Sequence, residues 1–212
     1  MNHPLNHPIV EQSFAIIDAE IGEHQLSPQE YAIARRVIHA TADFEYLKLL
    51  KFSPKAIESG IAAIKAGVPI VTDVTMVKQG IRNLVAKTFA NQVVAAIEQA
   101  KTADLGKTRT ETGLLRCWEK YPEAIYVIGN APTALLALCQ QLYNSPTVPG
   151  LVIGVPVGFV SVVESKKALA QLEVPQIVIE GRKGGSPAAA SILNALLILA
   201  SQESRTHVTW LG

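Results

Sequence analysis

The stretch Ile125-Tyr126-Val127-Ile128-Gly129-Asn130-Ala131-Pro132 shows most clearly how this 212-residue chain folds. Its first four residues are all β-branched or aromatic, which is typical of a strand that is buried on both faces. A glycine turn follows, and proline suits the first position of a helix because that position needs no backbone N–H. The stretch therefore predicts a buried strand that leads directly into a helix.

The same strand, turn and helix pattern recurs on either side of this stretch, at residues 69–73, 151–155 and 177–180. Residues 44–50 are a further candidate strand, although Glu45 and Lys48 also suit a helix. Strands that alternate with helices favour a parallel sheet with helices packed on both faces. We therefore expect a three-layer α/β/α fold around a mostly parallel sheet of about five strands.

Helices are expected between these strands and before them, because apolar residues recur there at helical spacing. The expected helices cover about residues 8–21, 28–42, 54–67, 75–102, 108–121 and 187–200, and two more are expected after the turn at 129–133 and from about residue 162. The long stretch 75–102 can break near Gly80. No shift in composition marks a second domain, so residues 1–212 are predicted to form one domain, with residues 1–7 as a disordered or extended arm.

Composition excludes several classes of protein. Hydrophobic residues make up 49% of the chain, charged residues 17%, and the net charge is +1, so no global field steers the protein to nucleic acid. The most apolar tract, residues 187–200, is too short to span a membrane. No signal peptide is recognised, and Cys117 and Cys139 lie far apart, as in reduced cytosolic proteins. We therefore expect a cytoplasmic protein that binds neither nucleic acid nor membrane.

The motifs that usually carry cofactor chemistry are missing from the sequence. No G-x-G-x-x-G follows a strand, no P-loop ending is present, and no G-x-S-x-G elbow occurs. The Cys and His residues form no cluster with metal-ligand spacing. The absence of these motifs disfavours a nucleotide- or CoA-binding enzyme, and it predicts a protein without a cofactor or a bound metal.

Loops at the carboxyl ends of the strands are the expected ligand site, as in other open parallel sheets. Turns that begin at Gly129, Val155 and Gly181 fall there. The loop from Gly181 also carries Arg182 and Lys183, so together with the helix that follows it can cradle a carboxylate or phosphate. The alternative is a tight strand-to-helix turn whose charges are simply solvated.

The helix at 28–42 contributes a second group of candidates. Ser27 and Glu30 have the spacing of a capping box, and Arg36, His39 and Asp43 then fall on one stripe of the helix. A cation, an imidazole and a carboxylate on one stripe can bind an anionic substrate and move a proton. The alternative is structural, since the helix dipole alone favours a His in the last turn by about 0.3–1 kcal/mol. Asp43 either orients His39 or ends the helix.

Six segments, taken together and in this order, resemble the precorrin-8X methylmutase family over about residues 8–200. They are Ser13-Phe14 with Glu20; Arg36-Val37-Ile38-His39-Ala40-Thr41 with Asp43; Val71-Thr72-Asp73 with Met76-Val77; Gly129-Asn130-Ala131-Pro132-Thr133-Ala134-Leu135; Gly154-Val155-Pro156-Val157-Gly158-Phe159 with Glu164-Ser165-Lys166; and Gly181-Arg182-Lys183-Gly184-Gly185-Ser186.

The resemblance implies His39 as the catalytic acid–base residue and Ser13 and Arg36 as substrate contacts. Arg109 is a weaker candidate, because Thr110 stands where the family usually has Ser after Thr-Arg. The strand-end loops add further substrate-binding candidates, which are Asn130, Thr133, Arg182 and Ser186. The resemblance also implies the strand order 3-2-1-4-5 and a homodimer with its pocket near the subunit interface.

The activity that the resemblance implies is an isomerisation in cobalamin biosynthesis. A methyl group moves from an α-carbon of ring C of an anionic tetrapyrrole to the adjacent β-carbon. The substrate is precorrin-8X or cobalt-precorrin-8, and the product is hydrogenobyrinate or cobyrinate, which can pass to the next enzyme of the pathway. The alternative is a non-enzymatic corrinoid carrier, for which the same loops would serve and His39 would be dispensable.

Overall fold

The computed structural model describes residues 7–208, and the side chains of residues 7–204. The expected arm at residues 1–7 lies outside the described residues except for His7. That residue is the N-cap of the first helix, α1 (Pro8–Ile21), and its ring nitrogen Nδ1 accepts a hydrogen bond from the Ile9 N–H at 3.3 Å. Within residues 7–208, none of the helices combines the length and apolar character needed to cross a lipid bilayer.

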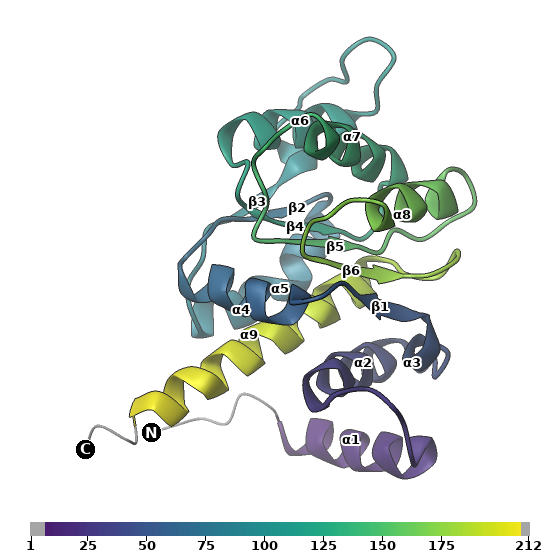
Figure 1. Cartoon of the computed structure of the whole chain (residues 1–212), viewed down its shortest axis with the longest axis vertical. Coiled ribbons are helices and arrows are strands. Elements are labelled where there is room, and N and C mark those ends of the chain that lie inside the picture. Colours follow the sequence, from purple (N-terminus) through teal and green to yellow (C-terminus); the bar gives the residue numbers. More distant parts are fainter. Residues whose placement is uncertain (1–6, 209–212) are drawn as a thin grey trace.

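A six-stranded sheet forms the middle layer, in the order β1-β6-β5-β4-β2-β3 (Figure 1). Its strands are β1 (Leu50–Phe52), β2 (Ile70–Thr72), β3 (Val93–Ala95), β4 (Ile125–Ile128), β5 (Leu151–Gly154) and β6 (Gln176–Ile179). Strands β2 to β6 are parallel to one another, and β1 pairs antiparallel with β6 at one edge. The expected mostly parallel sheet is confirmed.

Helices cover both faces of this sheet, as predicted. One layer holds α2 (Pro28–Thr41), α4 (Ala56–Lys65), α5 (Thr75–Lys87) and the long α9 (Ser186–Val208), while the other holds α6 (Arg109–Lys120), α7 (Pro132–Tyr143) and α8 (Val162–Ala170). Two short elements, α3 (Tyr46–Leu49) and η1 (Ala96–Glu98), connect helices to strands. Helix α1 packs outside the first layer, against α2.

The strand count and order differ from the expectation. The expected helix at 75–102 ends at Lys87, and after Ala90, whose φ is +54°, the chain enters β3 on the outer side of β2. The candidate strand at 44–50 is wrong for most of its length, because Tyr46–Leu49 form a helical turn and β1 begins at Leu50. Numbered along the chain, the five parallel strands run 2-1-3-4-5 rather than 3-2-1-4-5.

This order places a topological switch point between β2 and β4, where the connections leave the sheet in opposite directions. Ligands of open α/β sheets bind outside the carboxyl ends of the strands, beside such a point. The same edge receives the loops after β4, β5 and β6, since these strands are parallel neighbours. The substrate-binding candidates from these loops therefore lie along one edge of the sheet; they are Asn130, Thr133, Arg182 and Ser186.

Helix α2 begins with the predicted capping box. The Ser27 hydroxyl accepts from the Glu30 N–H at 3.3 Å, and a Glu30 carboxylate oxygen accepts from the Ser27 N–H at 2.8 Å. Its buried face, Ile33, Ala34, Val37 and Ile38, packs on α9. Since each of these side chains is at most 1% exposed, α2 is a fixed part of the core. The side chains on its outer stripe are therefore held in register with the sheet.

Candidate active site

The loops after β5 and β6 are joined into one unit at the carboxyl edge of the sheet. The Gly185 N–H donates to the Val155 carbonyl at 2.9 Å, and the Gly158 N–H donates to the Arg182 carbonyl at 3.3 Å. Gly184 lies so close to the Val155 carbonyl that a Cβ atom there would overlap its oxygen, and its φ of +148° also favours glycine. The two glycine turns therefore support each other.

Asp73 ties the ends of β2 and β4 together at the switch point. One of its carboxylate oxygens accepts from the backbone N–H groups of Asn130 at 2.6 Å and Ala131 at 2.8 Å, and the other accepts from Val74 N–H at 2.9 Å. Burial raises the pKa of this carboxyl, and the backbone N–H donors oppose that shift. The N–H groups of the loop after β4 thus bind Asp73, which leaves the exposed Asn130 side chain as the group that faces outward.

The amino-terminal ends of α6 and α7 meet through two threonines, whose Oγ1 atoms lie 3.0 Å apart. These are Thr108, the N-cap of α6, and Thr133, in the first turn of α7. Arg109 is exposed at the first position of α6. Figure 1 shows α6 and α2 in opposite layers, so one chain does not place Arg109 beside His39.

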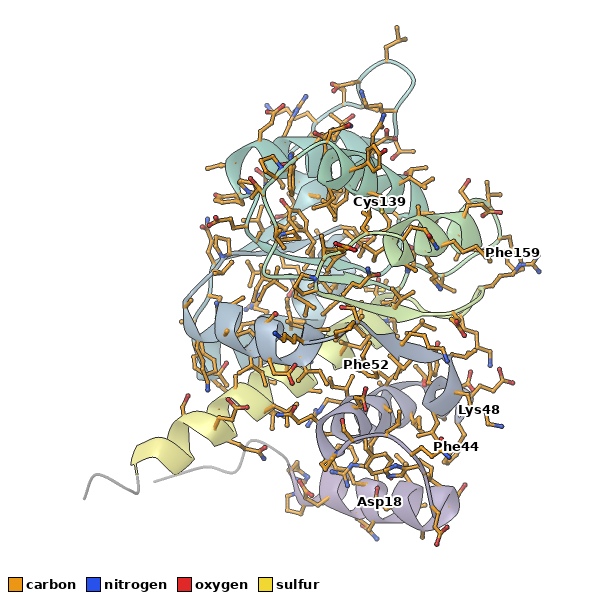
Figure 2. The ribbon with its side chains drawn as sticks, in the orientation of Figure 1. Asp18, Phe44, Lys48, Phe52, Cys139 and Phe159 are labelled. Carbon is orange, nitrogen blue, oxygen red and sulfur yellow. The ribbon has the colours of Figure 1, made fainter. Side chains whose placement is uncertain are left out.

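A cluster of ionic and aromatic contacts holds α1 against α2. The Asp18 carboxylate, in the position labelled in Figure 2, accepts from the Arg35 guanidinium at 2.7 Å and from the Tyr31 hydroxyl at 2.6 Å. Burial, followed by the Asp18 hydrogen bond, raises the pKa of Tyr31 to about 12. The Arg35 guanidinium carbon lies 4.4 Å from the centre of the Phe14 ring.

His39 lies in the last turn of α2 with its imidazole exposed. Its ring meets Phe14 edge-on, with the ring centres 5.4 Å apart. Among the side chains that the structure describes, the imidazole has no hydrogen-bond or ion-pair partner, so both nitrogens are open to a ligand. Arg36 lies nearby, 5.6 Å from the same Phe14 ring, and burial is the main cause that lowers the pKa of its guanidinium.

Ser13 shares this corner on the α1 side. Its hydroxyl donates to the Ile9 carbonyl at 2.9 Å, so its oxygen can still accept a hydrogen bond. Arg36 and His39 both lie against the Phe14 ring, and Ser13 precedes Phe14 in the chain, so the three candidates belong to one region of α1 and α2. A cation, a proton-transferring ring and a hydroxyl at one surface can hold a carboxylate and protonate a nearby atom.

Asp43 does not orient His39. Its carboxylate accepts from the Lys183 ammonium at 2.6 Å and from the Glu45 N–H at 3.0 Å, and the helix ends at Ala42, whose φ is +53°. Glu45 also pairs with Lys183, at 2.8 Å. The Lys183 hydrogen bond is the main cause that lowers the pKa of Asp43. This ion pair links the end of α2 to the loop after β6.

Two further side chains fix that loop, residues 181–185. The Lys166 ammonium donates to the carbonyls of Gly181 at 2.9 Å and Lys183 at 2.6 Å, and the Tyr46 hydroxyl donates to the Gly184 carbonyl at 3.3 Å. Phe159, labelled in Figure 2, is 84% exposed, and its ring lies 5.6 Å from the guanidinium carbon of Arg182 in the loop.

Ser186, another predicted ligand contact, begins α9 and is only 7% exposed. The close approach of Gly129, whose added Cβ would lie 3.0 Å from the Ser186 Cα, joins the loop after β4 to the start of α9. Only a small part of the Ser186 residue is therefore accessible to a substrate.

The sequence analysis assigned no structural contact to three residues of this framework: Asp73, Lys166 and Thr108. The role of Asp73 could have been predicted from the sequence. A carboxylate directly after a buried strand needs hydrogen-bond donors, and the edge of the sheet supplies them. Lys166 stands inside an otherwise amphipathic helix, and only the apolar Val162 and Leu169, one helical turn away on either side, hint at burial. Thr108 was recognised as a helix start, but its contact with Thr133 depends on tertiary packing.

Comparison with known proteins identifies the family of this chain. A family model described as precorrin-8X methylmutase matches residues 8–199. The chain belongs to the precorrin-8X methylmutase family. As a member of the family it is an enzyme, an isomerase of cobalamin biosynthesis.

Individual methylmutases match over nearly their whole length. The cobalt-precorrin-8 methylmutase of Synechocystis sp. is 58% identical over 94% of this chain and 99% of its own. The precorrin-8X methylmutase of a Sinorhizobium species is 38% identical over 89% of this chain and 92% of its own. The crystal structure of the precorrin-8X methyl mutase of Thermus thermophilus superposes with a TM-score of 0.84 at 43% identity, covering 92% of this chain and 96% of that one.

Proposed function

We propose that this methylmutase moves a methyl group on ring C of cobalt-precorrin-8, or of metal-free precorrin-8X, with His39 as the general acid and base. The observation that carries the proposal is the exposed imidazole of His39 at the corner shared with Arg36 and Ser13. The Synechocystis relative, named for the cobalt-containing substrate, favours cobalt-precorrin-8.

The main chemical step that the protein would assist in this reaction is the transfer of one proton. An intramolecular shift across a conjugated macrocycle needs neither a methyl donor nor a redox cofactor. Protonation of a ring nitrogen makes the macrocycle electron-poor and so favours migration of the methyl group. Imidazole suits this step because it gives and retakes a proton near neutral pH. A positioned general acid contributes on the order of 10²–10⁴ in rate.

The peripheral carboxylates of the tetrapyrrole would be held by guanidinium groups, since the Arg fork binds both oxygens of a carboxylate. Arg36 on α2 and Arg182 in the loop after β6 carry such groups, and the Lys183–Asp43 ion pair links that loop to the end of α2. The polar contacts that complete the binding surface in this proposal are Ser13, Asn130, Thr133 and Ser186. Arg109 would reach the same pocket only across a subunit interface, because its helix lies in the layer opposite α2.

A homodimer is part of the proposal. The stripe of α1 that flanks Ser13 exposes Ile9 by 65% and Ile16 by 56%, and Met76 at the start of α5 is 67% exposed. Exposed apolar side chains beside a candidate site are typical of a protein interface. We further place the enzyme in the cytoplasm, where its product would pass to the next enzyme of the pathway.

An absorbance time course tests the proposal. Purified protein would be mixed with metal-free precorrin-8X and, separately, with cobalt-precorrin-8, at substoichiometric enzyme. Catalytic conversion of either substrate to its corrin product is the expected result, faster with the cobalt form. Tight binding of substrate or product without turnover of either would contradict the proposal and leave the corrinoid carrier as the better account.

A further inference from the structure

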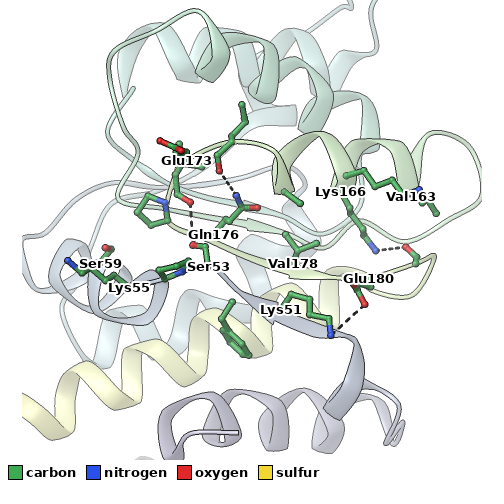
Figure 3. Close-up of a pocket in the computed structure, with 18 residues that line it drawn as sticks. Lys51, Ser53, Lys55, Ser59, Val163, Lys166, Glu173, Gln176, Val178 and Glu180 are labelled. Carbon is green, nitrogen blue, oxygen red and sulfur yellow. Dashed lines mark hydrogen bonds and ion pairs between the residues drawn. The ribbon is translucent and has the colours of Figure 1, made fainter. Parts of the chain in front are cut away.

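A cavity of about 860 Å³ opens over β1 and β6, between α8 and the start of α4 (Figure 3). Its walls are largely apolar and include Val163 and Ala170 of α8, Val174 of the connection to β6, and Val178 of β6. Drug-sized ligands occupy cavities of about 300–1,000 Å³ with apolar walls and a few polar groups. The cavity therefore has the size and lining of a small-molecule site.

This cavity lies on the opposite face of the sheet from His39. Side chains alternate between the two faces along a strand. Gln176, Val178 and Glu180 line the cavity, whereas Ile177 and Ile179 point to the other face, into the core that α2 and α9 share. The cavity is thus separate from the corner where Ser13, Arg36 and His39 meet.

The cavity wall contains a buried cation without an anionic partner. Lys166 is 3% exposed, and its ammonium donates to two backbone carbonyls. No carboxylate among the described residues pairs with it, and burial lowers its pKa to about 8. An ammonium has three N–H donors, so one is left for a ligand. Because a buried charge without a counterion is costly, an anion in the cavity would be favourable.

The other charged groups of the lining strengthen this preference. Four lysines line the cavity, at 51, 55, 166 and 167, against Glu173 and Glu180. Lys51 pairs with Glu180 at 3.7 Å, whereas Lys55 and Lys167 are exposed and form no ion pair with any described residue. The excess of cations at the mouth and in the wall matches an anionic group on a ligand.

Gln176 adds an unused acceptor. Its amide nitrogen donates to the carbonyls of Leu169 and Leu172, both at 2.9 Å, which fixes the orientation of the amide. Its amide oxygen is buried and has no hydrogen-bond partner among the described residues, and Figure 3 shows the side chain in the cavity wall. A ligand with an N–H or O–H group would satisfy this oxygen.

We propose that this cavity is a second binding site, for a small amphiphilic anion. Its apolar body fills the space between α8 and β6, its acidic group binds Lys166 and Lys167, and an N–H or O–H group donates to Gln176. The proposal goes beyond the methylmutase reaction and does not depend on it, so its test needs no corrin substrate.

Anilinonaphthalene sulfonate is a suitable probe, because it combines an aromatic body, a sulfonate and one N–H group. Titration of the folded protein, followed by probe fluorescence and by calorimetry, should show one saturable site per chain. Ala170→Trp fills the cavity from an exposed position of α8 and should weaken binding at least about tenfold. Unchanged binding to this variant would place the probe on another apolar surface and overturn the proposal.

A matched pair of charge variants tests the anionic part. Lys167→Glu should weaken probe binding about tenfold, while Lys101→Glu, the same change at an exposed residue outside the cavity, should leave it within about twofold. Octanoate should displace the probe and neutral octanol should not. Equal loss in the two variants, or displacement by octanol as strong as by octanoate, would overturn the proposal. Thermal unfolding of each variant verifies that it is folded.

Discussion

The loop at 181–185 and helix α1 both carry residues of the candidate site, but they differ in how many elements hold them in place. Side chains from several elements bind the loop, whereas α1 packs mainly against α2. Lys166, Tyr46 and Asp43 reach the loop from α8, α3 and the end of α2. Helix α1 rests on α2 through the buried Phe14 and Ile17 and through the Asp18 cluster, and it leaves Ile9 and Ile16 exposed.

The difference separates the part of the site that one chain completes from the part that it does not. The loop is packed and hydrogen-bonded within a single copy, so its geometry is set by the fold. The exposed apolar stripe of α1 is a surface that a second copy can cover. The comparison therefore predicts that changes in the loop act on folding and activity together, while changes on the α1 stripe act on assembly.

The largest effect is expected from Gly184→Ala. A Cβ atom at this position overlaps the Val155 carbonyl oxygen, and a φ of +148° is strained for alanine. We expect a loss of about 3 kcal/mol in the free energy of unfolding, together with weakened substrate binding. Urea unfolding monitored by circular dichroism measures the first quantity.

Gly181→Ala is the matched control for that change. Gly181 also has positive φ, +73°, but nothing lies within 4 Å of the added Cβ. It should therefore cost only about 1 kcal/mol. Similar losses for the two variants would mean that the close packing of the two loops contributes little to stability.

An intermediate effect is expected from Ile16→Glu on α1. The charge falls in the exposed apolar stripe, so it should weaken the homodimer at least about tenfold while the monomer stays folded. Analytical ultracentrifugation over a range of concentrations measures this. Ala15→Glu, at an exposed position of the same helix that lies outside the stripe, should leave the dimer intact. A wild-type chain that is monomeric at all concentrations would contradict the assigned role of the stripe.

The smallest effect is expected from Asp43→Asn, which removes one link between α2 and the loop. Lys183 lowers the pKa of Asp43 below its ordinary 3.8, so this carboxylate stabilises the fold above that pH, and the contribution is lost as the pH falls through the lowered pKa. Because the pair is partly exposed, we expect at most about 1 kcal/mol. The melting temperatures of wild type and variant should differ at neutral pH and converge in acid; a difference that persists in acid would exclude the ion pair as its cause.

Local patterns predicted much of the fold. The strands at β2, β4, β5 and β6 and the capping box of α2 are confirmed, because each depends on residues that are neighbours in sequence. The prediction failed at β3, where Val93–Ala95 lack flanking Gly or Pro and follow an amphipathic helix without a visible break. It failed again at Tyr46–Leu49, where both periodicities fit.

The candidate site shows the same limit. His39, Arg36 and Ser13 are site candidates because they stand in recognisable motifs, and their roles stay predictions. The partner of Asp43 was missed because Lys183 is 140 residues away, and only the fold brings the two charges to 2.6 Å. The burial of Lys166 was missed for the same reason, since it depends on how α8 packs against β6.

The most direct test of the central claim compares His39→Ala with wild type in turnover and in substrate binding. If His39 supplies the proton, the variant should lose at least about 100-fold in turnover, seen as the rate of the absorbance change, while the dissociation constant of the substrate stays within about threefold. His39→Ala with wild-type turnover, or with parallel losses of binding and turnover, would contradict a catalytic His39.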